Sequence, residues 1–170
     1  HNAGKDIFLL GLLPYYEREF QKEALVRSVH FGTHIEGNEL NLSQAEKVLE
    51  GKEVLARDRD IQEVINYRRV IELIDQLSIS NSQFSIDEEL IKKLHKMTVE
   101  RILEPEKCGK FRETQVVVKN STTGEVSFRP PPSTAIPAQM EEFLQFINDQ
   151  EKLDIHPVLN AGVVHYELVR

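Results

Sequence analysis

Two histidines, His30 and His34, are four residues apart, so on a helix they would project from the same face. Histidines at this spacing bind Zn²⁺ in many proteins. A zinc protease would also carry a glutamate directly after the first histidine, but Phe31 stands there instead. Because the sequence indicates no third ligand, we interpret the pair as solvent-facing or hydrogen-bonded side chains and expect no metal site.

Cys108 is the only cysteine, and with a remote histidine such as His165 it could form a nucleophile and its base. A lone cysteine beside Gly109 and Lys110 is more often structural, and we favour that interpretation. Gly109-Lys110 also lacks the upstream glycine and the following Ser or Thr of a phosphate-binding loop. Since one cysteine cannot form an internal disulfide, we expect a reducing, cytoplasmic location.

Glu36 is a carboxylate at an unusual place. An apolar-rich segment runs up to it, and the following Gly37-Asn38 is a strong signal for the end of a helix. Glu36 therefore falls in the last helical turn, where the helix dipole disfavours an anion. It is either an exposed carboxylate that the fold tolerates or one placed to meet a cation elsewhere.

Helices account for most of the chain by hydrophobic periodicity. Apolar residues recur at helical spacing over 58–77, over 90–102 and over 140–147, where Pro137 supplies a first-turn proline. Ser43 with Glu46, and Ser85 with Glu88, fit the capping box that opens a helix. Residues 156–170 are apolar on so much of their helical surface that we expect a central helix.

A β-hairpin is predicted where the helical rhythm breaks. Residues 111–118 favour a strand, 120–124 a turn and 126–128 a returning strand, between Pro105 and the prolines at 130–132. An isolated hairpin is only marginally stable in water, so it should lie on the helical body with an edge available for another chain. The predicted fold is therefore a mainly α helical bundle with one β-hairpin.

Charge and composition exclude some functions. The formal net charge is -7 and the pI about 5.4, which argues against general binding to nucleic acid or to an anionic membrane. The apolar stretch at 7–13 is too short to span a bilayer, and we expect it to be a packed N-terminal helix. The length of 170 residues suits one domain with a sizeable core.

Three groups of residues follow one another along the chain: Thr33 to Asn38 with Leu42-Ser43 and 64–67, Gly109 to Arg112 with 116–118 and 128–132, and His156 to Ala161 with 165–170. Taken together and in this order, they resemble the Fic family. The resemblance implies an N-terminal helical region with an inhibitory helix over 1–57. It also implies a Fic-like core over 58–170, incomplete and truncated at its C-terminus, with a flap hairpin at about 109–128.

Fic proteins usually transfer AMP from ATP, with Mg²⁺, to a hydroxyl of a target protein, and the resemblance implies this adenylyltransferase activity. Their signature, His-Pro-Phe-x-Asp/Glu-Gly-Asn-Gly-Arg, normally follows directly after residues that match Tyr166 to Arg170. The sequence stops there, so no catalytic residue is assigned in this chain, and neither His156 nor His165 takes that role. We expect the chain as given to be inactive.

The resemblance gives Glu36, with Gly37 and Asn38, an inhibitory role. Glu36 would pair with the second signature arginine and obstruct the γ-phosphate of ATP. A like-charge contact at about 4 Å costs roughly 4 kcal/mol at an effective dielectric of about 20, so one carboxylate is enough to act as a switch. The family usually has Ser or Thr four residues before this glutamate, where this chain has Gly32, and Thr33 stands one place later.

The flap would hold a target segment by strand addition and so position its hydroxyl; the alternative is a purely structural hairpin. A homodimer is a further partner that the family implies. Two other functions stay open, namely a different reaction on the same scaffold (removal of AMP, or transfer of phosphate or phosphocholine) and a non-enzymatic binding or regulatory module. The implied flap residues are Gly109, Lys110, Phe111, Arg112, Val116, Val117 and Val118.

Overall fold

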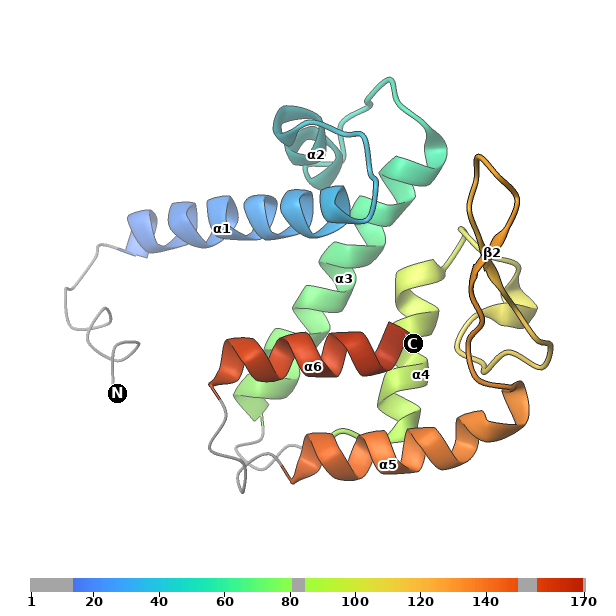
Figure 1. Cartoon of the computed structure of the whole chain (residues 1–170). Helices are drawn as coiled ribbons and strands as arrows, with labels where there is room; N and C mark the ends of the chain where they lie inside the picture. The colour runs from blue at the N-terminus through green and yellow to red at the C-terminus, as the bar shows by residue number, and fades with distance from the viewer. Residues whose placement is uncertain (1–13, 81–84, 150–155, 170) are drawn as a thin grey trace. The chain divides into compact units, whose positions relative to one another are not determined.

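Helices and one short hairpin make up the computed structural model, which describes residues 14–80, 85–149 and 156–169 (Figure 1). The predicted mainly α fold with one β-hairpin is confirmed. The helix expected over 7–13 lies outside the described residues, as does Arg170. In chain order the elements are α1 (Pro14–Ile35), α2 (Leu42–Leu49), α3 (Asp58–Ser80), α4 (Glu88–Val99), the 3₁₀ helix η2 (Pro105–Lys107), β1 (Val118–Lys119), β2 (Val126–Phe128), the 3₁₀ helix η3 (Ser133–Ala135), α5 (Ile136–Asn148) and α6 (Pro157–Val169).

The chain divides into two compact units, with the division between Gln76 and Leu77 inside α3. In the first unit, α2 lies beside the C-terminal half of α1 and near the start of α3 (Figure 1). The predicted helix over 58–77 is confirmed, although only part of its apolar face is covered, since Ile65 and Ile74 are exposed. The buried core of this unit consists of Val29, Leu40, Ala45, Val48 and Val64.

Both predicted capping boxes are wrong. At the start of α2 the box is formed by Asn41 and Gln44, each side chain accepting the backbone N–H of the other at 3.0 Å. At the start of α4 the cap is Asp87, whose carboxylate accepts the Leu90 N–H at 2.8 Å. Asn and Asp compete with Ser as N-caps, so a neighbouring Asn or Asp moved each helix start.

In the second unit, α5 is tied to the segment that leads into α4. Near the end of α5, Asn148 donates to the Ile86 carbonyl at 2.8 Å and accepts the Ile86 N–H at 3.0 Å, while Ser85 donates to the same amide oxygen at 3.1 Å. Pro137 lies in the first turn of α5, as predicted, and Phe143 is its buried residue. This end of the unit is therefore held by side-chain hydrogen bonds as well as by apolar packing.

The helix predicted over 156–170 is confirmed as α6 (Pro157–Val169), but the prediction that it is central is wrong. The helix α6 forms and packs against α5, but Val158 is 71% exposed and Leu159 66% exposed. Val163, Tyr166 and Leu168 are exposed as well. One neighbouring helix covers one face only, whereas a central helix needs neighbours on several sides. Within the described ranges, no helix is long and apolar enough to cross a membrane.

The hairpin is confirmed, but its strands are shorter than predicted. Of the expected strand 111–118 only Val118 belongs to β1, which is Val118–Lys119. This strand pairs antiparallel with 126–128, with Val118 opposite Phe128. The ladder stops near Phe128 because the three prolines at 130–132 have no N–H to donate. The turn is closed by Asn120, whose N–H donates to the Glu125 carbonyl at 2.8 Å.

Candidate functional site

Helix α1 ends in the turn predicted at Gly37-Asn38. Its last helical residue is Ile35, and Gly37 has a φ of +94°, which favours glycine. The Gly37 N–H donates to the His34 carbonyl at 3.0 Å, and the Asn38 N–H donates to the Thr33 carbonyl at 3.2 Å. These two bonds form the Schellman motif, so the backbone around Glu36 is fixed at both sides.

Glu36 occupies the C-cap position of α1 and its side chain is exposed. Its N–H donates to the Thr33 carbonyl at 3.1 Å, whereas its carboxylate has no hydrogen bond or ion pair to another described residue. The partly negative C-terminal end of a helix disfavours an anion there. A carboxylate presented in this way can accept a cation or repel a phosphate that comes near it.

Asn38 is the buried member of the turn, at 2% exposure. Its amide nitrogen donates both hydrogens, one to the Asp60 carbonyl oxygen at 3.0 Å and one to Glu63 Oε2 at 2.9 Å. Its amide oxygen accepts the Leu40 N–H at 3.1 Å. The side chain of Asn38 thus joins the end of α1 to the first turns of α3.

The first turns of α3, to which Asn38 bonds, are held by ion pairs. Asp60, at 2% exposure, accepts two hydrogen bonds from the Arg57 guanidinium at 2.8 and 2.9 Å, and this pairing raises the pKa of Arg57. Arg57 also lies 3.4 Å from Glu39, and Arg59 donates to Glu63 at 2.8 Å. Both residues to which Asn38 bonds are therefore themselves restrained.

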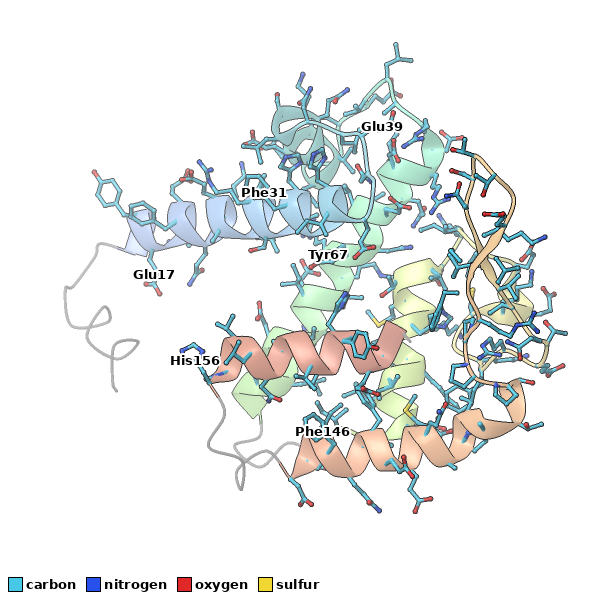
Figure 2. The ribbon with its side chains drawn as sticks, in the orientation of Figure 1. Glu17, Phe31, Glu39, Tyr67, Phe146 and His156 are labelled. Atoms are coloured by element: carbon cyan, nitrogen blue, oxygen red, sulfur yellow. The ribbon has the colours of Figure 1, made fainter. Side chains whose placement is uncertain are left out.

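There is a structural reason why residue 32, four residues before Glu36, is glycine and not Ser or Thr. Tyr67 of α3 packs against Gly32 of α1, and Figure 2 shows Tyr67 below the C-terminal half of α1. A β-carbon on residue 32 would lie 2.4 Å from both Cζ and the hydroxyl oxygen of Tyr67. Thr33 does not replace a hydroxyl at position 32, because its Oγ1 donates to the Val29 carbonyl of its own helix at 2.9 Å.

The two histidines have structural partners. His30 is buried, and burial lowers its pKa, with the nearby His34 as a second cause. The two rings stack at 5.5 Å, and His34 Nδ1 lies 2.9 Å from the Asn38 carbonyl, to which it donates in one tautomer. In the described part of the chain, no group of three His, Cys, Asp or Glu side chains could hold a metal ion.

The base of the hairpin is seated on α4. Gly109 has a φ of +70°, and its N–H donates to His95 Nδ1 at 3.0 Å. A β-carbon there would lie 2.9 Å from the Lys92 carbonyl oxygen, so this contact requires glycine. The Lys92 ammonium lies 5.0 Å from the centre of the Phe111 ring, a cation–π contact, while Lys110 is exposed.

Side chains join the two arms of the hairpin above this base. Arg112 donates to the Pro131 carbonyl, Gln115 Nε2 donates to the Pro130 carbonyl at 2.9 Å, and Ser133 donates to the Glu113 carbonyl at 2.9 Å. Beyond these bonds, four apolar side chains are 43–52% exposed on the two arms and Val117 is half-buried. The exposed four are Val116, Val118, Val126 and Phe128.

Cys108 is half-buried at the end of η2, where its sulfur lies 3.5 Å from the Glu104 carbonyl oxygen. Two further carbonyl oxygens, of Val99 and Leu103, lie within 3.9 Å of it. A thiol among backbone carbonyl oxygens acts as a weak hydrogen-bond donor. This environment agrees with a structural role.

The predicted residues thus fall into two sets. Glu36, Gly37 and Asn38 form one turn in the first unit, and the seven residues predicted for a flap lie in the hairpin and its base in the second. The sequence analysis did not identify five residues that position these two sets. The available signals were two charge pairs at helical spacing, Arg57 with Asp60 and Arg59 with Glu63. The missed residues are Asp60, Glu63, Tyr67, His95 and Gln115.

Comparison with known proteins gives a consistent result. Residues 85–170 match the model of the Fic/DOC family. The "Protein adenylyltransferase fic-1" of Caenorhabditis elegans is 28% identical over 156 residues, covering 89% of this chain and 29% of that protein. The "Protein adenylyltransferase Fic" of Culex quinquefasciatus is 26% identical over 151 residues, covering 88% of this chain and 28% of that protein.

The fold is also shared with solved structures. A Fic-domain-containing signalling protein from Bacteroides thetaiotaomicron VPI-5482 superposes with a TM-score of 0.76 at 23% identity, covering 93% of this chain and 59% of that chain. This likeness concerns the fold. The chain spans less than a third of the length of the two adenylyltransferases that it matches.

Proposed function

We propose a function from the fact that this chain belongs to the Fic/DOC family. The whole protein transfers AMP from ATP to a hydroxyl side chain of a target protein. The observation that carries the proposal is the family match over 85–170, together with relatives that are named protein adenylyltransferases. In the reaction the target hydroxyl attacks the α-phosphorus of ATP, loses its proton to a general base, and displaces pyrophosphate.

ATP and Mg²⁺ enter the proposal through the family alone. Among the described residues, no group of three or more acidic, His or Cys side chains could hold a metal ion. The sequence also contains no glycine-rich phosphate loop. We therefore derive no step through the metal and assign no catalytic residue in this chain.

We infer that Glu36 restrains this activity. Three features of the turn support the role: the carboxylate is exposed, it ends a helix at the partly negative pole, and its backbone is fixed by the Schellman motif. A carboxylate with a fixed backbone can hold an arginine that would otherwise bind the triphosphate. It also repels a phosphate directly, so ATP would bind in a less productive way.

We infer that the hairpin is the target-binding flap. Its arms expose Val116, Val118, Val126 and Phe128, which gives a target segment apolar surface beside the strand edge. The base is seated on α4 through Gly109 and Phe111. A rigid base with an exposed outer part suits a segment that aligns a target hydroxyl for attack.

The proposal includes a cytoplasmic location, supported by the single cysteine, and self-association as a homodimer, which the family suggests.

The competing functions are a different transfer on the same scaffold and a non-enzymatic module. The test is incubation of the whole protein with ATP, Mg²⁺ and cell extract, followed by intact-mass and peptide mass spectrometry. Addition of AMP to Ser, Thr or Tyr is expected; loss of AMP, or addition of phosphate or phosphocholine, would identify the alternatives.

A further inference from the structure

We propose that Asn38 is a positioning residue that couples the location of Glu36 to the first turns of α3. The inference rests on the proposed inhibitory role of Glu36 and adds the route by which that role is controlled. It is carried by the contacts of one buried side chain.

All polar groups of Asn38 have partners. The side chain makes three hydrogen bonds, to the Asp60 carbonyl, to Glu63 and from the Leu40 N–H. The backbone N–H bonds to Thr33, and the backbone carbonyl lies 2.9 Å from His34 Nδ1. A buried amide whose two N–H groups and oxygen all have partners has one favourable orientation, because any other leaves a donor or acceptor unpaired.

The position of Asn38 in the chain makes this orientation relevant to Glu36. The two residues are separated only by Gly37, which has a φ of +94° and no atom within 4 Å of where a side chain would begin. Gly37 by itself therefore gives the turn no packing restraint. The amide of Asn38 supplies that restraint, and it does so against α3 rather than against α1.

The α3 side of the contact is held by surface charges. Arg57 donates a hydrogen bond to Asp60 and forms a second ion pair with Glu39. Arg59 forms an ion pair with Glu63. The side chains of Arg57 and Arg59 are 54% and 71% exposed. A ligand that drew these arginines away would loosen Asp60 and Glu63, and the loss would reach Glu36 through Asn38.

The first experiment compares Asn38→Ala with and without Glu36→Gly in the whole protein, measuring AMP incorporation from labelled ATP. With Glu36 present, Asn38→Ala is expected to raise incorporation about tenfold, equivalent to about 1.4 kcal/mol. With Glu36→Gly already in place, it should add nothing further. A residue that merely supports the fold would lower activity in both backgrounds.

Asn41→Ala is the matched control. Asn41 is the N-cap of α2, three residues along the chain, and also accepts a backbone hydrogen bond. The control should lower the melting temperature without raising AMP incorporation. A rise with Asn41→Ala as large as that with Asn38→Ala would overturn the inference, because any local loosening would then have the same effect.

A second pair of variants tests the contact itself and does not require alanine at the buried site. Asn38→Asp places a carboxylate against Glu63 and should relieve inhibition. Adding Glu63→Gln provides an amide that can donate to the new carboxylate, so inhibition should return at least in part. Relief that Glu63→Gln leaves unchanged would contradict the proposed contact.

The two levels of the proposal fail differently. If Glu36→Gly itself gives no rise, the inhibitory function fails and the role of Asn38 falls with it. If Glu36→Gly gives a rise but Asn38→Ala and Asn38→Asp do not, the inhibitory function stands and only the coupling through Asn38 is wrong.

Discussion

Tyr67 lies against Gly32 so closely that a β-carbon on residue 32 would come within 2.4 Å of the phenol ring at Cζ. The contact joins the last turns of α1 to the middle of α3, one turn before Glu36. It accounts for a glycine in the interior of a helix, where glycine is unfavourable by about 1 kcal/mol relative to alanine. The ring of Tyr67 fills the space that the missing side chain leaves.

This contact predicts that Gly32→Ala lowers the free energy of unfolding, although alanine is the better helix former. Overpacking of this kind costs typically about 1–3 kcal/mol. In a Tyr67→Ala background the sign should reverse, because the added methyl group then meets no ring and the helix propensity gains about 1 kcal/mol. Urea denaturation of the four proteins measures this cycle. Equal effects of Gly32→Ala in both backgrounds would contradict the contact.

The buried His30 predicts a loss of stability at mildly acidic pH. Burial, with the charge of His34 as a second cause, lowers the pKa of His30 below its ordinary value of 6.5. The unfolded chain therefore binds more protons than the folded protein below that value, so the free energy of unfolding falls as the pH drops from 6.5 toward the folded pKa.

Thermal unfolding at a series of pH values between 7.5 and 5 measures this loss. His30→Gln should show a smaller decrease than the parent protein, whereas His165→Gln, which changes an exposed histidine of α6, should keep the parental decrease. The explanation fails if His30→Gln and His165→Gln give the same pH profile.

The ion pairs of Glu50 predict a second loss of folding stability, at more acidic pH. Its carboxylate lies 2.6 Å from the Lys22 ammonium and 2.7 Å from that of Lys52, and these bonds lower its pKa from 4.5 to about 2. A depressed carboxylate pKa stabilises the folded state above 4.5, and this contribution is lost as the pH falls through about 2. Glu50→Gln should therefore reduce the decline of stability across this interval.

Salt provides the check on this assignment. The side chain of Lys22 is 50% exposed, so dissolved ions screen its attraction to Glu50. The difference between the parent protein and Glu50→Gln should shrink as the salt concentration increases. Glu53→Gln, on the loop after α2, serves as the control, and a difference that is independent of salt would speak against the ion pairs.

Gln115 predicts a selective effect on target binding. Its amide joins the first arm of the hairpin to the Pro130 carbonyl at 2.9 Å. Gln115→Ala should loosen the two arms and raise the KM for the target protein several-fold, with ATP affinity unchanged. Thr122→Ala at the tip of the hairpin keeps the hydrogen bond from its own N–H to the Asn120 side-chain oxygen and should behave like the parent protein. An equal loss of ATP affinity would place Gln115 outside the proposed flap function.

The sequence predicted those features that depend on neighbouring residues. Periodicity located α3 and α5, proline placed the start of α5, and glycine placed the end of α1. It misplaced two helix caps because Asn41 and Asp87 compete with the serines that fit the pattern. It also overestimated the strand before Val118, because the prolines at 130–132 follow the returning strand and cannot donate ladder hydrogen bonds to it.

Features that depend on distant parts of the chain could not be predicted in this way. The bond from Asn38 to Glu63 joins residues 25 positions apart, and no periodicity relates them. The exposure of α6 is a similar case, because an apolar helix surface shows what can be buried but not what packs against it. Glu36 was found by its place at a helix end, while the residues that support it required the structure.

The proposed inhibitory role of Glu36 is tested most directly by the rate of AMP incorporation from labelled ATP in the whole protein carrying Glu36→Gly. The rate should rise by about tenfold or more, the effect of removing an electrostatic penalty of at least about 1.4 kcal/mol. Glu53→Gly, the same substitution on an exposed loop of the same unit, should leave the rate unchanged. An unchanged rate with Glu36→Gly, at an unchanged melting temperature, would contradict the inhibitory role of Glu36.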